Sequence, residues 1–391
     1  MQALLFTPSI PRYLAARALG KRYPASAVPL RLVPWPFEGP PAGFVEARVR
    51  LAGLCGSDLA LLFGKNSPRL APFFSFPAIL GHEILAEYGG ARVAVNPLLT
   101  CADRGLPPCP ACQRGEEPLC QNVAEGALAP GMIGYHRDLP GGFGPFVFAR
   151  PERLYPIPDA VPDARAVLAE PLAVVVRGLR KAFYRGRWIW PEDILIIGAG
   201  TIGLLSLAAL RALGFDGTLV VLARRKNQQQ LAERLGASRV FSRAGDALRF
   251  SGAKAYRPPL GPPVWRGGFA ASIDAAGTPS SLDTAAWGTR EGGQILLLGA
   301  AGETRHDFSP HWFAEVALVG SYTYAPADFK DAVSLLTALE GTEALVGPPF
   351  RLAAWRDALD VARKKTFAKV VFAPKEDTAV RVAVPAAVPA P

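Results

Sequence analysis

Apolar residues in the first part of the chain recur mostly at every second position, between breaks rich in Pro and Gly. The series Val45, Ala47, Val49 and Leu51 shows the alternation that a half-buried strand requires. No long helical period competes with this pattern over residues 1–150. The first part of the chain is therefore predicted to form an all-β, barrel-type domain.

The pattern changes near Pro162, after which helix-like and strand-like stretches alternate over short links. A stretch with helical spacing over 163–183 precedes a strand-like and then helix-like stretch over 191–214. Further strands are expected at 218–222, 269–277, 292–302 and 316–325, and further helices at 227–236 and 280–288. This alternation predicts an α/β unit with a doubly wound parallel sheet.

Composition limits the class of protein. The chain has 391 residues, and 50% of them are hydrophobic, which is enough to bury a core and excludes wholesale disorder. The length indicates two or three domains. Five cysteines are too few for a disulfide scaffold, and no N-terminal secretion signal is recognisable. We therefore expect a cytoplasmic protein whose cysteines are thiols or metal ligands.

The net charge of +10 is compatible with nucleic acid, a membrane surface, an anionic ligand or simply a solvated arginine-rich surface. No nucleic-acid recognition signature accompanies the charge, so no nucleic-acid partner is expected. The uncharged stretch 194–210 is interrupted by glycines, which favours a strand, a turn and a helix over a membrane span.

A glycine-rich turn joins this strand-like stretch to the helix-like stretch. Residues Gly198, Gly200, Thr201, Ile202 and Gly203 belong to a G-x-G-x-x-G motif with the correct flanks. Gly198 allows the tight turn, Gly200 lets the backbone approach a pyrophosphate, and Gly203 lets helix and strand pack closely. The motif predicts a dinucleotide-binding site.

The end of the next strand indicates which dinucleotide is bound. An acidic residue about 20 positions after the motif would bind the ribose 2′-hydroxyl of NAD. This chain instead has Ala223, followed by Arg224, Arg225 and Lys226. Because these cations suit a 2′-phosphate, NADP is expected and NAD is less favoured.

Four cysteines form a separate cluster in the sequence. Cys101, Cys109, Cys112 and Cys120 have the spacing C-x₇-C-x₂-C-x₇-C. Four thiolates so close in sequence predict a closed, tetrahedral structural zinc site, and the alternative is four free thiols.

The fifth cysteine has a different neighbourhood. Cys55 lies in GLCGSDLALLFG, His82 and Glu83 lie in GHE, and Glu170 lies further along in AEPL. A thiolate, an imidazole and a carboxylate can hold a second zinc and leave a fourth position open. Cys55 and His82 alone are a weak signal, because both residue types are often buried for packing.

In combination, GLCGSD, GHE, the cysteine lobe, AEPLAV, GAGTIG and KTFAKVVF resemble the zinc-dependent medium-chain dehydrogenase/reductase superfamily. The resemblance covers roughly residues 2–374 and points to the alcohol, sorbitol, glucose and threonine dehydrogenase kind. It implies a GroES-like catalytic domain interrupted in sequence by a Rossmann domain. The implied ranges are 1–165 for the catalytic domain with a zinc lobe at about 97–122, 166–322 for the Rossmann domain, 323–374 for the return to the catalytic domain, and 375–391 for a flexible tail.

The resemblance also implies roles for individual residues. Cys55 and His82 would be catalytic zinc ligands, with Glu83 or Glu170 as the third. Ser57 would pass the substrate proton onward, and Asp58 would orient His82. The implied reaction transfers a hydride between an alcohol or polyol, sugar-type substrates included, and NADP in a homodimer or homotetramer.

Three positions depart from the family pattern. Leu106 stands where the first cysteine of the lobe is usual, so Cys101 needs an inserted loop to reach the metal. Ala60 stands where many relatives have the histidine that ends the proton relay, and Pro145 stands where a glutamate is frequent. Two rival functions stay open: a zinc-independent NADPH reductase of activated double bonds, and a non-catalytic NADP-binding protein.

Overall fold

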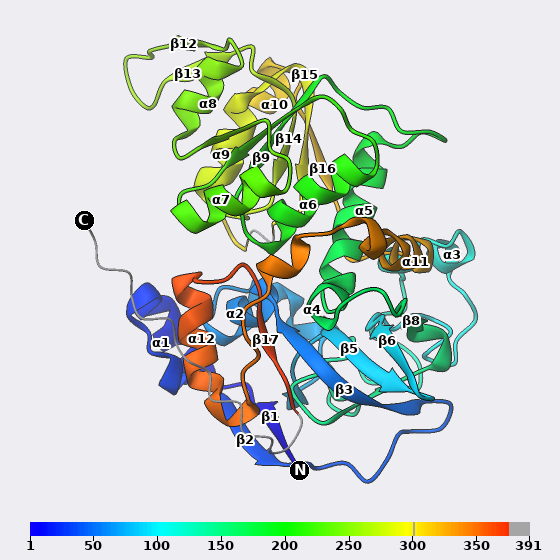
Figure 1. Cartoon of the computed structure of the whole chain (residues 1–391). Helices are drawn as coiled ribbons and strands as arrows, with labels where there is room; N and C mark the ends of the chain where they lie inside the picture. The colour runs from blue at the N-terminus through cyan, green and yellow to red at the C-terminus, as the bar shows by residue number, and fades with distance from the viewer. Residues whose placement is uncertain (300–301, 375–391) are drawn as a thin grey trace.

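Short, mostly antiparallel strands build one half of the molecule, in the lower part of Figure 1. The computed structural model describes residues 1–299 and 302–374. The larger sheet of this half has the order β17-β3-β5-β6-β8, with β7 paired to β3, and a smaller sheet has the order β2-β1-β4. The strands are β1 (Gln2–Phe6), β2 (Leu30–Pro34), β3 (Val45–Leu54), β4 (Ala78–Ile79), β5 (Glu83–Tyr88), β6 (Ala91–Val95), β7 (Phe146–Ala149), β8 (Leu154–Pro156) and β17 (Val370–Phe372). The expected barrel-type part is confirmed.

A parallel sheet builds the other half, with the order β11-β10-β9-β14-β15-β16. Its strands are β9 (Asp193–Ile197), β10 (Thr218–Leu222), β11 (Arg239–Phe241), β14 (Phe269–Asp274), β15 (Thr289–Leu297) and β16 (Ala317–Gly320). The chain runs outward from β9 to one edge and then returns to β14 and the other edge. This is the doubly wound arrangement expected from the sequence, and ligands bind such sheets at the carboxyl ends of the strands, where the order reverses.

Helices cover the parallel sheet, and others pack in the antiparallel half. They are α1 (Ile10–Leu19), α2 (Gly56–Leu62), α3 (Pro110–Gln113), α4 (Asp163–Ala166), α5 (Ala169–Phe183), α6 (Thr201–Ala212), α7 (Lys226–Arg234), α8 (Ala244–Phe250), α9 (Pro279–Gly288), α10 (Ser309–Phe313), α11 (Pro326–Leu335) and α12 (Trp355–Lys364). Alternate residues of β9 enter different cores. Ile194 and Ile196 pack with residues of α5 and α6, whereas Leu195 packs with residues of α8 and α9. The buried, apolar character of β9 follows from its being covered on both faces.

The last strand that the structure describes, β17, joins the antiparallel sheet formed by the first part of the chain. In Figure 1, β17 lies beside β3, although the whole parallel sheet separates them in sequence. The two strands pair antiparallel, with Val370 opposite Leu54 and Phe372 opposite Ala52. Residues of α12 and β17 share a hydrophobic core with β1, β3 and β5. The closing segment of the chain is therefore part of the antiparallel half.

Some elements differ from the sequence expectation. Helix α1 lies in a region expected to be all-β, and Ala16 is its only buried residue, so no apolar stripe announced it. A hairpin of β12 (Lys254–Tyr256) and β13 (Val264–Arg266) is inserted before β14. The tail expected at 375–391 lies outside the described residues. Within the described ranges, no helix is long and apolar enough to cross a membrane.

Candidate functional site

Three ligand-type side chains converge where β3 and β5 lie side by side. Cys55 directly follows β3, His82 directly precedes β5, and Glu83 is the first residue of β5. Antiparallel pairing of Gly53 with Glu83 places these chain ends next to each other. One ligand atom from each of Cys55, His82 and Glu83 lies within 4.8 Å of the others. A thiolate, an imidazole and a carboxylate at this spacing fit a zinc ion.

Asp58 connects the cysteine to the histidine. Its buried carboxylate accepts the backbone N–H of Cys55 on Oδ2 at 3.0 Å, which also caps the start of α2. Oδ1 of the same carboxylate lies 3.5 Å from Nδ1 of His82. A carboxylate at one ring nitrogen fixes the orientation of the ring, so that the other nitrogen can face a metal. Ser57 places Oγ 3.3 Å from that other nitrogen, Nε2.

Glu83 has a buried counter-ion to which the sequence assigned no role. Nζ of Lys369 lies 2.6 Å from Oε1 and 2.5 Å from Oε2 of Glu83, and both residues are buried. Burial by itself would lower the pKa of Lys369, but the neighbouring Glu83 raises it, so the ammonium form persists. A Cβ at Gly53 would lie 2.0 Å from Oε2 of Glu83, so only a glycine leaves room for this pair.

Glu170 belongs to a neighbouring pair. It lies in the first turn of α5, and the hydroxyl of Tyr324 donates to its Oε1 at 2.8 Å. Burial raises the pKa of Glu170 to about 7. The structure thus groups Glu83 with Cys55 and His82, and it holds Glu170 to one side through a tyrosine that sequence reasoning missed.

Tyr135 is a second tyrosine that sequence reasoning missed. It lies in the loop between the short helix η4 (Glu117–Leu119) and β7. Its Oη is 2.8 Å from Oδ1 of Asp58 and 3.1 Å from Oγ of Ser57, and its ring centroid is 5.1 Å from that of His82. No spacing rule connects this loop to GLCGSD or GHE, so the sequence carries no signal for the contact.

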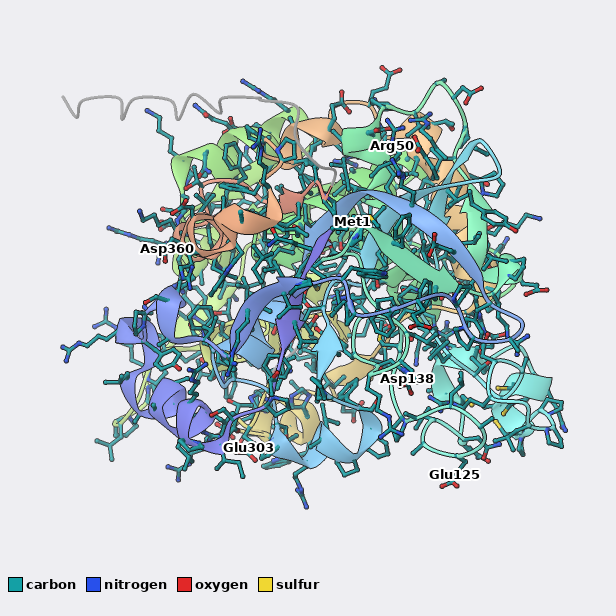
Figure 2. All side chains as sticks on the ribbon, turned by 90° about the horizontal axis from the view of Figure 1, so that it is seen from below. Met1, Arg50, Glu125, Asp138, Glu303 and Asp360 are labelled. Carbon is teal, nitrogen blue, oxygen red and sulfur yellow. The ribbon has the colours of Figure 1, made fainter. Side chains whose placement is uncertain are left out.

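The four cysteines of the lobe come together. One ligand atom of each lies within 4.8 Å of the others: Cys101, Cys109, Cys112 and Cys120. Figure 2 shows sulfur atoms gathered at one edge of the molecule, near the labelled Glu125. The backbone N–H of Gln121 donates to Sγ of Cys109 at 3.4 Å and, with the backbone N–H of Cys112, lowers the pKa of that thiol to about 6. Four thiols in this arrangement fit a closed, tetrahedral zinc site.

The inserted loop that carries the first cysteine closes on itself. The N–H of Leu106 donates to the carbonyl of Cys101 at 2.9 Å. Arg104 inside the loop is fully buried, and its Nη1 donates to the carbonyl of Leu128 at 3.0 Å. The compact turn absorbs the insertion and places Sγ of Cys101 3.6 Å from Sγ of Cys120.

The glycine-rich turn joins β9 to α6. Gly198 has a φ of +100°, which favours glycine, and a Cβ at Gly203 would lie 1.8 Å from the carbonyl oxygen of Gly198. A Cβ at Gly200 would meet nothing within 4 Å, so the space beside the start of α6 is open for a phosphate. The Thr201 hydroxyl donates at 2.6 Å to the carbonyl of Ala368, just before β17, and Ile202 packs against the core. These two side chains fasten the turn.

Cations gather at the end of β10. Arg224, Arg225 and Lys226 are exposed there, between the strand and the body of α7. Lys365 approaches from the antiparallel half: burial lowers the pKa of Lys365, and the charges of Arg225, Lys65 and Arg224 lower it further. Such a concentration of positive charge attracts an anion such as a phosphate group.

Comparison with known protein families gives two matches. The family described as the alcohol dehydrogenase GroES-like domain matches residues 41–159, and the zinc-binding dehydrogenase family matches residues 201–338. Sorbitol dehydrogenase of Bacillus subtilis is 28% identical over 81% of this chain and 86% of its own length. L-galactonate-5-dehydrogenase of Escherichia coli is 29% identical over 74% of this chain and 78% of its own length.

Solved structures share the fold. A Sinorhizobium meliloti protein described as a zinc-binding dehydrogenase, bound to NADP, has a TM-score of 0.67 and 26% identity, covering 88% of this chain and 95% of its own. Galactitol-1-phosphate dehydrogenase of Escherichia coli has a TM-score of 0.71 and 22% identity, covering 96% of this chain and all of its own.

Proposed function

The chain belongs to the zinc-dependent medium-chain dehydrogenase/reductase superfamily, an oxidoreductase family acting on CH–OH groups, and we propose that it transfers a hydride between a polyol or sugar-type alcohol and NADP. The observation that carries the proposal is the convergence of Cys55, His82 and Glu83. The sugar-type substrate is supported by relatives that are named for L-galactonate, sorbitol and D-xylulose.

We assign the catalytic zinc to Cys55, His82 and Glu83, with Glu170 beside it. When bound, zinc acidifies a coordinated hydroxyl, and NADP accepts or returns the hydride. The protein's own groups prepare the site: Asp58 orients His82, Lys369 balances the buried charge of Glu83, and Ser57 faces the position of the substrate hydroxyl.

We assign the dinucleotide to the turn at Gly198, Gly200 and Gly203, where α6 begins. Arg224, Arg225 and Lys226 are the proposed contacts of the 2′-phosphate. The absence of an acidic residue at position 223 and the exposure of these cations support NADP over NAD. The turn side chains Thr201 and Ile202 hold this segment in place.

The division of the chain is also a proposal. We place the catalytic domain at 1–165 and 323–374 and the Rossmann domain at 166–322, with the structural zinc in the lobe at about 97–122. A homodimer or homotetramer is supported by the position of β16 at the edge of the parallel sheet, where Leu318 is 41% exposed. A reducing cytoplasm would keep the lobe thiols available to zinc.

Metal dependence tests the proposed chemistry. A chelator should abolish alcohol oxidation and added zinc should restore it, whereas Cys55→Ser should remain inactive with or without zinc. Activity that withstands both the chelator and Cys55→Ser would reject the zinc mechanism and favour a zinc-independent reductase.

The substrate class has a separate test. Screening sugars, polyols, amino alcohols and simple alcohols with both cofactors identifies it. Cofactor binding without turnover on any of these compounds would reject the proposed reaction.

Cofactor choice has its own test. Arg224→Asp should raise the KM for NADP and leave or improve the KM for NAD, because the carboxylate repels a 2′-phosphate and can bind a 2′-hydroxyl. The exposed Arg12 on α1 supplies the matched control, and Arg12→Asp should change neither KM. Wild-type kinetics that favour NAD would contradict the assignment.

A further inference from the structure

The partners of Ser57 differ from what the family pattern implies. Ala60 stands where many relatives have the histidine that ends the proton relay, so Ser57 lacks that neighbour. In the structure, Oγ of Ser57 instead lies 3.1 Å from Oη of Tyr135 and 3.3 Å from Nε2 of His82. The phenol of Tyr135 is therefore the hydroxyl partner of the serine in this chain.

Tyr135 is held firmly. It is 7% exposed, and its ring packs edge-on against Phe74 with the centroids 5.3 Å apart. Its N–H donates to the carbonyl of Met132 at 2.8 Å, and its own carbonyl accepts the N–H of Ser75 at 3.3 Å. A Cβ at Gly131 would lie 2.2 Å from the Tyr135 carbonyl oxygen, so the loop packs closely around this residue. The phenol has a fixed position.

The number of hydrogens on each group limits which hydroxyl donates and which accepts in these contacts. A phenol has one hydrogen to donate, and a carboxylate can only accept. Oη of Tyr135 is 2.8 Å from Oδ1 of Asp58, so the phenol hydrogen goes to this charged acceptor. The Ser57 hydroxyl can then donate to Oη of Tyr135 or to Nε2 of His82, and once a metal takes the lone pair of Nε2, Oη is the acceptor left to it. Its lone pairs are left to face the site.

We propose that Tyr135 is a positioning residue that turns the Ser57 hydroxyl into an acceptor for the substrate hydroxyl and holds Asp58 against His82. The proposal rests on the proposed alcohol dehydrogenase function. Its second part does not depend on turnover, because Oδ1 of Asp58 is shared between Tyr135 and Nδ1 of His82. Tyr135 thus acts through two neighbours: Ser57 toward the substrate, and Asp58 toward His82.

The test is Tyr135→Phe, which removes one oxygen and keeps the ring packing. To test the role toward the substrate hydroxyl, we measure alcohol oxidation by this variant. Its kcat should fall about tenfold or more, while the KM for NADP stays within twofold. The release rate of the catalytic zinc to a chromophoric chelator, measured without substrate, should rise about tenfold, because Asp58 loses a partner that holds it near His82. The matched control is Tyr23→Phe: Tyr23 is equally buried, and its hydroxyl donates at 2.8 Å to the carbonyl of Ala27, away from the site.

The outcomes separate the two proposals. A Tyr135→Phe enzyme with kcat within twofold of wild type and unchanged zinc release overturns the role of Tyr135 and leaves the dehydrogenase function standing. A wild-type enzyme inactive on every alcohol rejects the dehydrogenase function, and the zinc-release measurement still decides whether Tyr135 supports His82. Recovery of kcat in a Tyr135→Phe, Ala60→His double variant would show that a histidine at position 60 can replace the partner that Tyr135 provides to Ser57.

Discussion

Lys369 and Glu83 form a buried ion pair although they are 286 positions apart in sequence. The pair joins the segment before β17 to the first residue of β5, directly beside His82. Because the ammonium contacts both carboxylate oxygens, it offsets the cost of burying a negative charge beside the candidate metal ligands Cys55 and His82. The ion pair makes the geometry of the candidate zinc site depend on the closing segment of the chain.

Lys369→Met should therefore destabilise the protein strongly. In protein stripped of zinc, the substitution leaves Glu83 buried without a counter-ion, and we expect the free energy of unfolding to fall by about 3–5 kcal/mol in urea titrations. Lys364→Met, at an exposed position of α12, should change it by less than about 0.5 kcal/mol. Adding Glu83→Gln to Lys369→Met should recover part of the loss. A single variant no less stable than the control would mean that the pair is not needed.

Cys101→Ser should behave like Cys112→Ser. Each removes one of four thiols that share a site, so each should lower the zinc content by one ion per chain and reduce the melting temperature. Cys55→Ser should also cost one zinc, but it should abolish turnover with little change in melting temperature. Metal analysis and calorimetry distinguish the two patterns. Full zinc content in Cys101→Ser beside a loss in Cys112→Ser would show that the inserted loop does not supply a ligand.

Two glycines of the dinucleotide turn should respond in different ways. At Gly203 an added Cβ collides with the Gly198 carbonyl at 1.8 Å, so Gly203→Ala should lower both stability and cofactor affinity. At Gly200 the space is open, so Gly200→Ala should keep the melting temperature and weaken only NADP binding by blocking the pyrophosphate. Calorimetric titration with NADP measures the difference. Unchanged NADP affinity in Gly200→Ala would place the pyrophosphate elsewhere.

His136 should make stability depend on pH. Burial lowers the pKa of His136 to about 4, while its Nδ1 accepts the N–H groups of Asp138 and Leu139. The unfolded chain takes up a proton below its ordinary pKa of about 6.5 and the folded chain does not. Stability is therefore fully present above that pKa and is lost as the pH falls toward 4, by about 2 kcal/mol between pH 7.5 and pH 5.

His136→Asn supplies the comparison for this pH effect. The Asn carbonyl oxygen can accept the same two N–H groups but does not titrate. The variant should therefore lack this part of the pH dependence. The difference in unfolding free energy between wild type and variant, measured in urea at both pH values, removes the contribution of all other groups. A difference that stays constant from pH 7.5 to pH 5 would show that His136 does not titrate this way.

The elements with a strong local pattern of apolar residues were predicted correctly from the sequence. The strand expected at 218–222 coincides with β10, and the helix expected at 280–288 matches α9 to within one residue. Helix α1 could not be foreseen in this way, because it buries only Ala16 and exposes Ile10, Leu14 and Leu19. Most surface helices show an apolar stripe that faces the core, but α1 buries too little of its surface to need one.

The candidate site shows the same limit. Cys55, His82 and Glu83 were recognisable because each lies in a short motif. Lys369 lies in the motif KTFAKVVF, but its contact with Glu83 could not be foreseen, nor could that of Tyr135 with Asp58, because both contacts join segments that only the folded topology brings together. Short motifs in the sequence indicate the candidate ligands. The residues that contact and orient those ligands can come from any part of the fold, so the sequence does not indicate them.

The pairing of β17 with β3 has a consequence for synthesis on the ribosome. The parallel sheet is complete once β16 has emerged, whereas the antiparallel sheet lacks an edge strand until residues 370–372 are free. A nascent chain therefore exposes an unpaired edge of β3 and an uncompensated Glu83 during most of its translation. Truncation just before β17 should yield a chain whose parallel-sheet half folds while its antiparallel half aggregates.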